Sequence, residues 1–490
     1  MIQTNQAPSI SDVAQKLPRV FEEALRATTR LRSSWSPDRG TPVYTEAGQY
    51  TTRGWTEWTQ GFQFGNGIYL YEATGDTEML EYGRSSTVQH MAHHISHVGV
   101  HDHGFNNVST YGNLLRLMVE GKIPDNAWEA EFYRLALKIT GAVQAARWTP
   151  ISGNPGAGFV HSFNGPHSLF SDTIRSMRAL AVAHQLGHVL MGEQDERISL
   201  LQRLLAHAEA TAAYNVYFGN ARDGWDERGR VVHESIFNTH NGVYRCPSTQ
   251  QGYTPFSTWT RGLSWVLCGY PEELEWLRTM GESEFVAIGA DKAEIEARWI
   301  QVACATADFH LENTPTDGIP YWDTGAPNLH RLGDYLNQPA DPYNSYEPVD
   351  SSAAAISAQG LWRLGGYLID EAQRLSTSAT LDMDGTGRRQ HTAAELVSRG
   401  ETYRAAALVT AHALFDEPYL STNAQHQGIL LHSIYHQPNR WDYVHSGQRV
   451  ANGESCMWGD YHLLELAVML QREANGVGAQ DFYNAAGEIS

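Results

Sequence analysis

Apolar residues recur at helical spacing along most of the chain, and this pattern predicts an almost entirely α-helical protein. Near the start, Val13, Leu17, Val20, Phe21 and Ala24 fall on one face of a helix. Further segments with the same spacing follow, separated by short and long connections. After the first helix, we expect helices at about 58–71, 77–97, 105–119, 125–147, 169–190, 195–217, 259–281, 284–311, 350–371, 392–415 and 458–474.

The longest connections are where we expect function. The stretch 219–255 is rich in Gly, Asp, Asn and Thr and has only a short extended patch at 230–232. Its apolar residues are too irregular for a helix, so we interpret it as a functional loop. Other long loops are expected at 150–166, 312–349 and 416–457.

Nothing in the composition divides the chain. Its 490 residues contain no Ser/Gly linker, no low-complexity run and no change of composition. Hydrophobic residues make up 42% of the chain, which is ample for one large core. We therefore expect a single domain over residues 1–490, with a flexible start at residues 1–10.

The charge balance restricts the possible partners. Acidic residues outnumber basic ones, 55 to 35, which gives a formal net charge of -20. This argues against binding to nucleic acid or to an anionic membrane. A short anionic ligand is still compatible, because one or two local arginines can bind it within an acidic protein. The 14 Trp and 23 Tyr supply the side chains that line sugar clefts.

The cysteines and the chain start bear on the compartment. Cys246, Cys268, Cys304 and Cys456 lie far apart, without metal-ligand spacing or a small disulfide framework. The first residues lack a basic region followed by an apolar run, and no later stretch is long and apolar enough to span a membrane. We expect a cytoplasmic protein.

The stretch QGYTPFSTWTRGLSW, from Gln251 to Trp265, carries candidate binding chemistry. Arg261 follows Trp259 closely at the start of an apolar, helix-like segment. A planar, permanently charged guanidinium beside aromatic faces suits a sugar ring that bears a carboxylate. An arginine stacked on tryptophan purely as packing explains the same pattern equally well.

Two aspartates are candidates for proton transfer. Asp172 lies in SLFSDTIRSM, among apolar residues near a helix start, where partial desolvation would raise its pKa toward that of a proton donor. Asp102 follows a histidine and precedes His103 and Gly104 at a helix boundary. The residue types alone favour a structural interpretation, because aspartates at such places are usually helix N-caps.

Seven motifs then point to one family. WTRGLSW at 259–265 is similar to WARGQAW, HDHGF at 101–105 to HDxGF, and FSD at 170–172 to IID, while YWD at 321–323 recurs intact. With DSSAAAISAQGL, GILLHS and WGDYHLLE, the motifs follow the family's order over about residues 50–470. In these motifs the chain resembles the unsaturated glucuronyl hydrolases, glycoside hydrolase family 88.

The resemblance implies an all-α fold, an (α/α)6 barrel of six helical hairpins with the site at one mouth. It also implies a glycoside hydrolase that needs no cofactor. Such an enzyme removes a 4,5-unsaturated uronic acid from the non-reducing end of lyase-generated oligosaccharides by hydrating the C4=C5 vinyl ether. A short anionic oligosaccharide is therefore the expected partner.

The resemblance also implies roles for single residues. Asp172 takes the place of the catalytic acid and base, and Asp102 that of the second essential carboxylate. Arg261 is our preferred partner for the substrate carboxylate. His233 by itself looks like an ordinary surface-loop histidine, but it matches a family position that contacts the sugar. The positions implied in sugar binding are Trp58, His233, Gln251, Trp259 and Arg261.

The chain departs from the family at several points. FSDTIRSM replaces IIDNxxNL, which places Arg175 close after Asp172, and an arginine that reached this carboxyl would lower its pKa and oppose proton donation. HSF stands where the family has a tryptophan, so Phe163 is expected to replace one ring wall. Segments near 270–298, 374–392 and 436–453 look longer than the family's loops.

A histidine cluster precedes Asp102. His90, His94, His97 and His101 share one helical face, and such spacing can chelate zinc. No Glu follows the first histidine as in HExxH, and the family needs no metal. We expect a hydrogen-bonded helix face that leads to Asp102, and no metal site.

Two other functions fit the same residues. A hydrolase with this barrel could act on saturated glucuronides or on unsaturated rhamnogalacturonan fragments, because the ring wall and the surroundings of Asp172 are altered. A third hypothesis is a carbohydrate-binding protein that has lost catalysis. The presence of both Asp102 and Asp172 argues against it, because binding alone would not need both carboxylates. The oligomeric state does not follow from the sequence.

Overall fold

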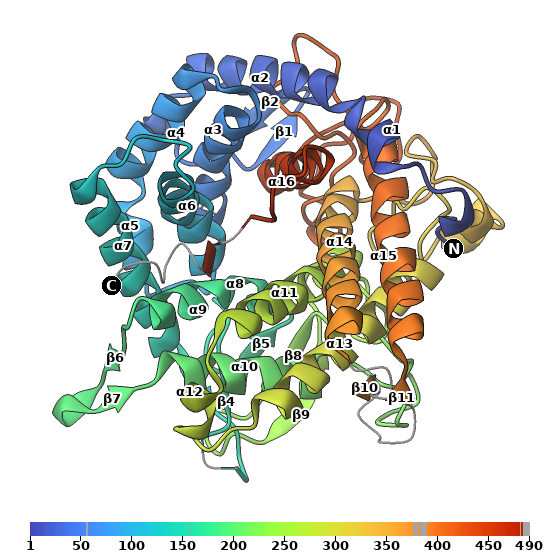
Figure 1. Cartoon of the computed structure of the whole chain (residues 1–490). Coiled ribbons are helices and arrows are strands. Elements are labelled where there is room, and N and C mark those ends of the chain that lie inside the picture. Colours follow the sequence, from blue (N-terminus) through green and yellow to red (C-terminus); the bar gives the residue numbers. More distant parts are fainter. Residues whose placement is uncertain (55–56, 155, 376–380, 383–389, 481, 484–490) are drawn as a thin grey trace.

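Helical hairpins form a closed ring in the computed structural model, which describes residues 1–54, 57–154, 156–375, 381–382, 390–480 and 482–483 (Figure 1). Within this part of the chain, the inner elements contact one another in chain order, and the last contacts the first. The expected (α/α)6 barrel is thereby confirmed. The inner elements are α3 Gln60–Thr74, the π-helix Gly104–Gly112 with α6 Asn113–Val119, α8 Thr173–Ser176 with α9 Arg178–Gln185, α11 Thr260–Thr279, α14 Ser351–Arg374 and α16 Met457–Ala474.

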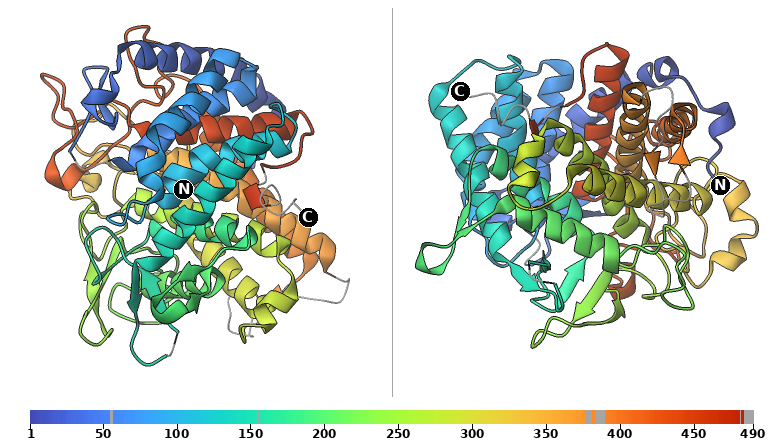
Figure 2. Two further views of the ribbon diagram at one scale, coloured as in Figure 1. Left: turned by 90° about the vertical axis from the view of Figure 1, so that its left-hand side faces the viewer. Right: turned by 60° about the horizontal axis from the view of Figure 1, so that its bottom comes forward.

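A second layer of helices surrounds this ring, as the three views of the barrel show (Figures 1 and 2). Each of the six long outer helices contacts an inner one, for example α4 on α3, α13 on α11 and α15 on α14. None of the described helices combines the length and the apolar character that crossing a bilayer requires. The outer helices are α2 Leu17–Ser34, α4 Thr77–His90, α7 Ala127–Ala146, α10 Leu200–Tyr214, α13 Lys292–Glu312 and α15 Ala393–Leu414, with the short α1 Ile10–Ala14, α5 Ala92–Ile95 and α12 Glu282–Val286.

Small residues let the inner helices approach one another closely. The first turns of α14 read SSAAAISAQG, and all of these residues are buried. A Cβ atom at Gly360 would lie 2.2 Å from the carbonyl oxygen of Leu267 in α11. The two helices therefore meet backbone to backbone, and a larger residue at position 360 would force them apart.

The inner ring also encloses a buried ion network. The Nε atom of Arg175 lies 2.8 Å from Glu272, and its Nη2 lies 3.1 Å from Glu465. Burial alone would raise the pKa of Glu465, but Arg175 and His462 lower it overall. The network joins α8, α11 and α16 across the barrel. It also holds Arg175 away from Asp172. This arginine is therefore not among the groups that lower the pKa of Asp172.

Short strands replace parts of two expected helices. Residues 168–170 form the strand β5, so the helix expected over 169–190 begins only at Thr173. The helix expected over 195–217 begins at Leu200, where the Ser199 hydroxyl caps α10. A projecting hairpin, β6 Leu190–Met191 and β7 Arg197–Ile198, fills the gap between them.

Antiparallel pairing organises the loop that we expected to be functional. β5 Ser168–Phe170, β8 Glu234–Phe237 and β9 Tyr244–Ser248 form a three-stranded sheet, which turns the chain toward Asp172. The remaining strands form separate two-stranded pairs. These are β1 Tyr44–Glu46 with β2 Gln49–Thr51, β3 Trp148–Pro150 with β4 Gly158–Val160, and β10 Leu381–Asp382 with β11 Gln390–His391.

The chain start contacts the barrel. Ile2 is buried, and its backbone N–H donates to the carbonyl oxygen of Leu311. The next backbone N–H, of Gln3, donates to the carbonyl oxygen of Thr316. The flexible start at residues 1–10 stays a prediction.

The buried network predicts a large effect of one substitution. We expect Arg175→Met to lower the free energy of unfolding by about 3–5 kcal/mol, because Glu272 and Glu465 would remain buried without their cation. Arg19→Met is the matched control, since Arg19 pairs with Asp416 where both side chains are 45% exposed, and little change is expected. Denaturant midpoints measure both effects. Equal midpoints for wild type and Arg175→Met would contradict the account.

Candidate active site

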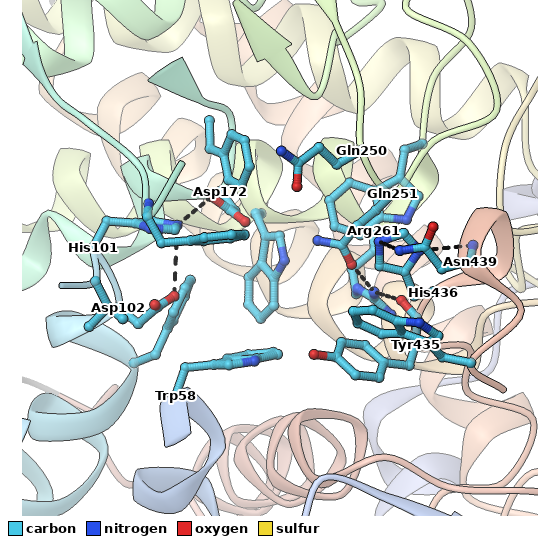
Figure 3. A pocket seen from close by; sticks show the side chains of 17 residues that line it. Trp58, His101, Asp102, Asp172, Gln250, Gln251, Arg261, Tyr435, His436 and Asn439 are labelled. Atoms are coloured by element: carbon cyan, nitrogen blue, oxygen red, sulfur yellow. Dashed lines mark hydrogen bonds and ion pairs between the residues drawn. The ribbon is translucent and has the colours of Figure 1, made fainter. Parts of the chain in front are cut away.

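A cavity of about 230 Å³ opens where the inner helices begin (Figure 3). Trp58 precedes α3, Asp102 precedes the π-helix, Asp172 precedes α8, and Arg261 lies in the first turn of α11. Because helix N-termini carry partial positive charge, this end of the barrel suits an anionic ligand. The lining residues are Trp58, Val100, His101, Asp102, Phe105, Phe163, Phe170, Asp172, Gln250, Gln251, Trp259, Arg261, Trp265, Tyr435, His436, Asn439 and Trp441.

Seven of the eight site residues expected from the sequence line this cavity, and His233 is the one that does not. These residues lie far apart in the sequence, and only the resemblance had assigned them to one site. The folded chain brings these segments together because they all end at the same mouth of the barrel. The seven are Trp58, Asp102, Phe163, Asp172, Gln251, Trp259 and Arg261.

One imidazole joins the two aspartates. The Nε2 atom of His101 lies 3.2 Å from Oδ1 of Asp172 and 3.7 Å from Oδ1 of Asp102 (Figure 3). Asp172 stands at the N-cap position of α8, but its side chain makes no capping hydrogen bond. The interpretation of Asp172 as a simple helix cap is therefore wrong. Its carboxyl faces the cavity instead.

The pKa values of the two aspartates shift in opposite directions, and that of Asp172 differs from our expectation. Burial alone would raise the pKa of Asp172, but the hydrogen bond and charge of His101 lower it overall. The expected raised pKa at Asp172 is therefore wrong. Burial does raise the pKa of Asp102, against the opposing effect of His101 and with the help of Asp172. The two carboxyls and the imidazole titrate as one group of interacting sites.

The His101 ring is held in one orientation. Its Nδ1 accepts the backbone N–H of Phe163 at 3.3 Å, so the ring proton is placed on Nε2, where it faces Asp172. The ring stacks on Phe163, with centroids 6.1 Å apart, and meets the edge of Phe170. Burial alone would lower the pKa of His101, but the neighbouring carboxylates raise it overall.

Arg261 is bound by the protein itself. Its Nη1 lies 3.2 Å from Asp350 and also donates to the carbonyl oxygen of Ile434. Its Nη2 donates to Oε1 of Gln251 at 3.0 Å and to the carbonyl oxygen of Tyr435 at 2.7 Å. Arg261 therefore fixes the loop above it with the donors that we had expected to hold a substrate carboxylate.

Aromatic faces complete the setting of this arginine. The guanidinium lies 4.8 Å from the ring centroid of Trp259 and 4.7 Å from that of Trp458. Trp458 in turn stacks on Trp58, with centroids 4.9 Å apart. Trp58 and Trp259 line the cavity, and the buried Trp458 completes the aromatic surroundings of the guanidinium.

His233 supports the wall from behind. Its Nδ1 accepts the backbone N–H of Gln250 at 3.1 Å, and its ring lies 4.4 Å from Phe170 and 4.6 Å from Trp259. Burial lowers the pKa of His233 to about 4, so the ring is neutral near pH 7. The interpretation as a surface-loop histidine is therefore wrong.

Sequence reasoning missed the far wall of the cavity. Tyr435, His436 and Asn439 lie across the cavity from the aspartates (Figure 3), and Trp441 of the same loop also lines it. This loop had looked like an insertion. Asp442 anchors this loop by accepting the backbone N–H of His436 at 2.8 Å, and burial raises its pKa to about 6. The aromatic and polar density of YHQPNRW was the available signal.

The histidines before Asp102 form hydrogen bonds. The Nε2 atom of His94 lies 2.8 Å from Oε1 of Gln60, and burial lowers the pKa of His94 to about 2. His103 contacts Thr140 at 2.6 Å and the carbonyl oxygen of His97 at 3.0 Å. Among the described residues, no three His, Cys, Asp or Glu side chains are grouped so as to hold a metal ion.

Comparison with known proteins gives consistent sequence relatives. No family model matches the chain. It is 24% identical to an unsaturated glucuronyl hydrolase of Bacillus sp. strain GL1 over 461 residues, 93% of this chain and 96% of that protein. A second one, from Formosa agariphila, is 24% identical over 323 residues, which is 64% of each chain and somewhat less than two thirds of that relative. An unsaturated chondroitin disaccharide hydrolase of Streptococcus pyogenes is 24% identical over 54% of this chain and 49% of that protein.

Solved structures share the fold. The unsaturated glucuronyl hydrolase of Bacillus sp. GL1 aligns with a TM-score of 0.64 at 22% identity, over 95% of this chain and 99% of that one. An unsaturated glucuronyl hydrolase described as specific for heparin also aligns with a TM-score of 0.64, at 22% identity over 94% and 98% of the two chains. In sequence and in fold, this chain is a distant relative of the unsaturated glucuronyl hydrolases.

Proposed function

We propose that the protein is a glycoside hydrolase that removes a 4,5-unsaturated uronic acid from the non-reducing end of short oligosaccharides. One observation carries this proposal: Asp102 and Asp172 face the same imidazole nitrogen inside an aromatic cavity of sugar size. The nearly full-length relative of the same named activity supports it. Residues 1–490 would act as one catalytic domain. The four free cysteines are compatible with a cytoplasmic enzyme, because thiols stay reduced in that compartment.

The reaction in this proposal is hydration of a vinyl ether. Asp172 transfers its proton to C4 of the unsaturated ring, and positive charge then develops at C5, next to the ring oxygen. Water adds to C5, and the Asp172 carboxylate takes up the proton that the water loses. The resulting hemiketal opens to a keto acid and releases the remaining sugar. Because one carboxyl performs both transfers, no second carboxylate at a fixed distance is required.

Substrate binding would raise the pKa of Asp172. Without substrate, the hydrogen bond from His101 keeps the pKa of Asp172 low, while the pKa of Asp102 is raised. A bound uronate adds a negative charge and displaces water, and both effects raise the pKa of a nearby carboxyl. Substrate entry would therefore favour the protonated form of Asp172 that the first step needs. Asp102 would hold sugar hydroxyls.

Arg261 would attract the substrate carboxylate mainly by its positive charge and not by direct hydrogen bonds. The donors of Arg261 are engaged by Asp350, Gln251 and the backbone of the far loop. Gln250, whose side-chain amide lies at the cavity (Figure 3), can donate a hydrogen bond to a carboxylate. We therefore assign Gln250 to direct binding of the carboxylate and Arg261 to the shape and the potential of the pocket.

A product screen tests the proposed reaction. Wild-type protein incubated with lyase digests of several uronate polymers should remove the ultraviolet absorption of the C4=C5 bond in at least one of them. Saturated aryl glucuronides should remain intact, because they have no vinyl ether. Cleavage of the aryl glucuronides alone would exclude hydration, and binding of unsaturated disaccharides without turnover would favour a carbohydrate-binding protein.

Substitution of the proposed acid separates chemistry from binding. Asp172→Asn should lower kcat by about 10²–10⁴-fold or more, because the amide cannot give a proton to C4. Calorimetry should show affinity for the unsaturated disaccharide within a few-fold of wild type, since the shape is kept. Asp76→Asn is a control on the surface, where Asp76 caps α4 and asparagine caps equally well. A fully active Asp172→Asn would remove this residue from the mechanism.

The contact with His101 predicts a shift of the pH profile. Protonated Asp172 is the active form, so kcat/KM falls as pH rises through its pKa in the free enzyme. His101 lowers that pKa, and His101→Phe should therefore move the falling limb to higher pH, by about one unit or more. His90→Gln, at the end of α4 and outside the residues that line the cavity, should leave the limb in place. A limb that stays or moves to lower pH in His101→Phe would contradict the proposed coupling.

A further inference from the structure

The outer helix α7 carries an apolar stripe on the side that faces away from the barrel. Its inner face is buried and includes Tyr133, Leu137 and Thr140. A row of apolar residues on the opposite side lies at the surface: Trp128 is 88% exposed, Phe132 38%, Leu135 56% and Ile139 37%, with half-buried Val143 at the end of the stripe. The helix expected over 125–147 is thus confirmed, and the described chain covers this outward face only in part, for example where Phe132 contacts the Tyr111 ring.

Such a stripe is unusual on the surface of a single chain. Isolated exposed apolar residues need no explanation, but a contiguous row of them marks an interaction site. The row spans about 22 Å along the helix, at about 1.5 Å per residue. The helix α7 lies on the side of the barrel that Figure 2 (left) turns toward the viewer, and none of its residues lines the cavity.

The stripe is complementary to itself. Trp128 and Val143 are equally far from its middle, and so are Phe132 and Ile139, with Leu135 next to the centre. Two copies of α7 packed antiparallel about a two-fold axis would therefore place Trp128 against Val143 and Phe132 against Ile139. Each large aromatic side chain would meet a smaller branched one, and the two Leu135 side chains would meet at the axis.

The charges beside the stripe fit the same arrangement. Glu131 and Lys138 lie on one flank, seven positions apart, and a two-fold axis near Leu135 brings the flank of one helix beside the same flank of the other. The carboxylate of Glu131, which pairs with Arg134 at 2.9 Å within its own helix, would then lie near Lys138 of the second copy. A parallel arrangement would set like charges at the same level.

We propose that α7 is the contact surface of a two-fold dimer of this chain. The occupant is a second copy, because both the apolar row and the flanking charges match themselves when reversed. A contact between two single helices is small beside the about 800 Å² per partner of a standard interface. The dimer is therefore reversible, and its population rises with protein concentration. This proposal does not depend on the proposed activity.

Sedimentation velocity over about a hundredfold range of concentration tests the dimer. Wild-type protein should pass from monomer to dimer as its concentration rises. Leu135→Glu, which places two negative charges at the axis, and Trp128→Ser should each weaken association at least about tenfold. Trp225→Ser is the matched control, because Trp225 is 60% exposed elsewhere on the surface. All variants should retain the wild-type activity and circular dichroism.

Cross-linking tests the symmetry of the contact. Leu135→Cys in a Cys246→Ser background, treated with the thiol oxidant diamide, should form a covalent dimer through the axis, and Trp225→Cys in the same background should not. A protein that is monomeric at every concentration would overturn the proposal. A dimer that Leu135→Glu and Trp128→Ser leave intact, or that Leu135→Cys fails to link, would also overturn it.

Discussion

The site depends on the contact between the His101 imidazole and the two carboxyls of Asp102 and Asp172. This contact lowers the pKa of Asp172 and opposes the burial that raises the pKa of Asp102, and it requires a ring that cannot turn. The protein fixes the ring with the backbone N–H of Phe163 on one nitrogen and with aromatic neighbours on both sides. Gln144 of α7 donates to the carbonyl oxygen of His101 at 2.7 Å, which also fixes the backbone there.

The barrel serves this contact by bringing distant segments to one end. The π-helix and the α8 segment meet so closely that a Cβ at Gly104 would lie 2.4 Å from the carbonyl oxygen of Ser176. The hydroxyl of Ser176 accepts the N–H of Gly104 at 2.8 Å and lies 3.0 Å from the amide of Gln144. These contacts hold the segments of the two aspartates in one register. The buried ions around Arg175 fasten the same helices farther down the barrel.

Much of the fold could be predicted from sequence, because helical periodicity is a local signal. Prediction from this periodicity failed where a short buried segment forms a strand, as in β5. Residues 168–170 are apolar enough for a helix, but Ser168 pairs with Ile236 in a sheet, and that partner lies far along the sequence. The direction in which the apolar stripe of α7 faces was not predictable either, since such a stripe has the same spacing whether it faces the core or the surface.

The candidate site was predictable in its residues and not in its electrostatics. Motif order placed Asp102, Asp172 and Arg261 at the cavity, yet their proton and hydrogen-bond partners come from His101, Asp350 and the backbone at 434–435. Spacing in the sequence contains no record of such contacts. This is why Asp172 was expected to have a raised pKa and Arg261 to have free donors, and why the loop anchored by Asp442 was missed.

The most direct test of the account follows the proton to carbon. An unsaturated disaccharide turned over once in D2O, with the product observed at once by NMR, should carry one deuterium at C4, delivered to a single face of the ring. That result would show stereospecific protonation of the alkene by a group fixed in the cavity. Release of the sugar while the C4=C5 bond is still intact and free of deuterium would contradict the account.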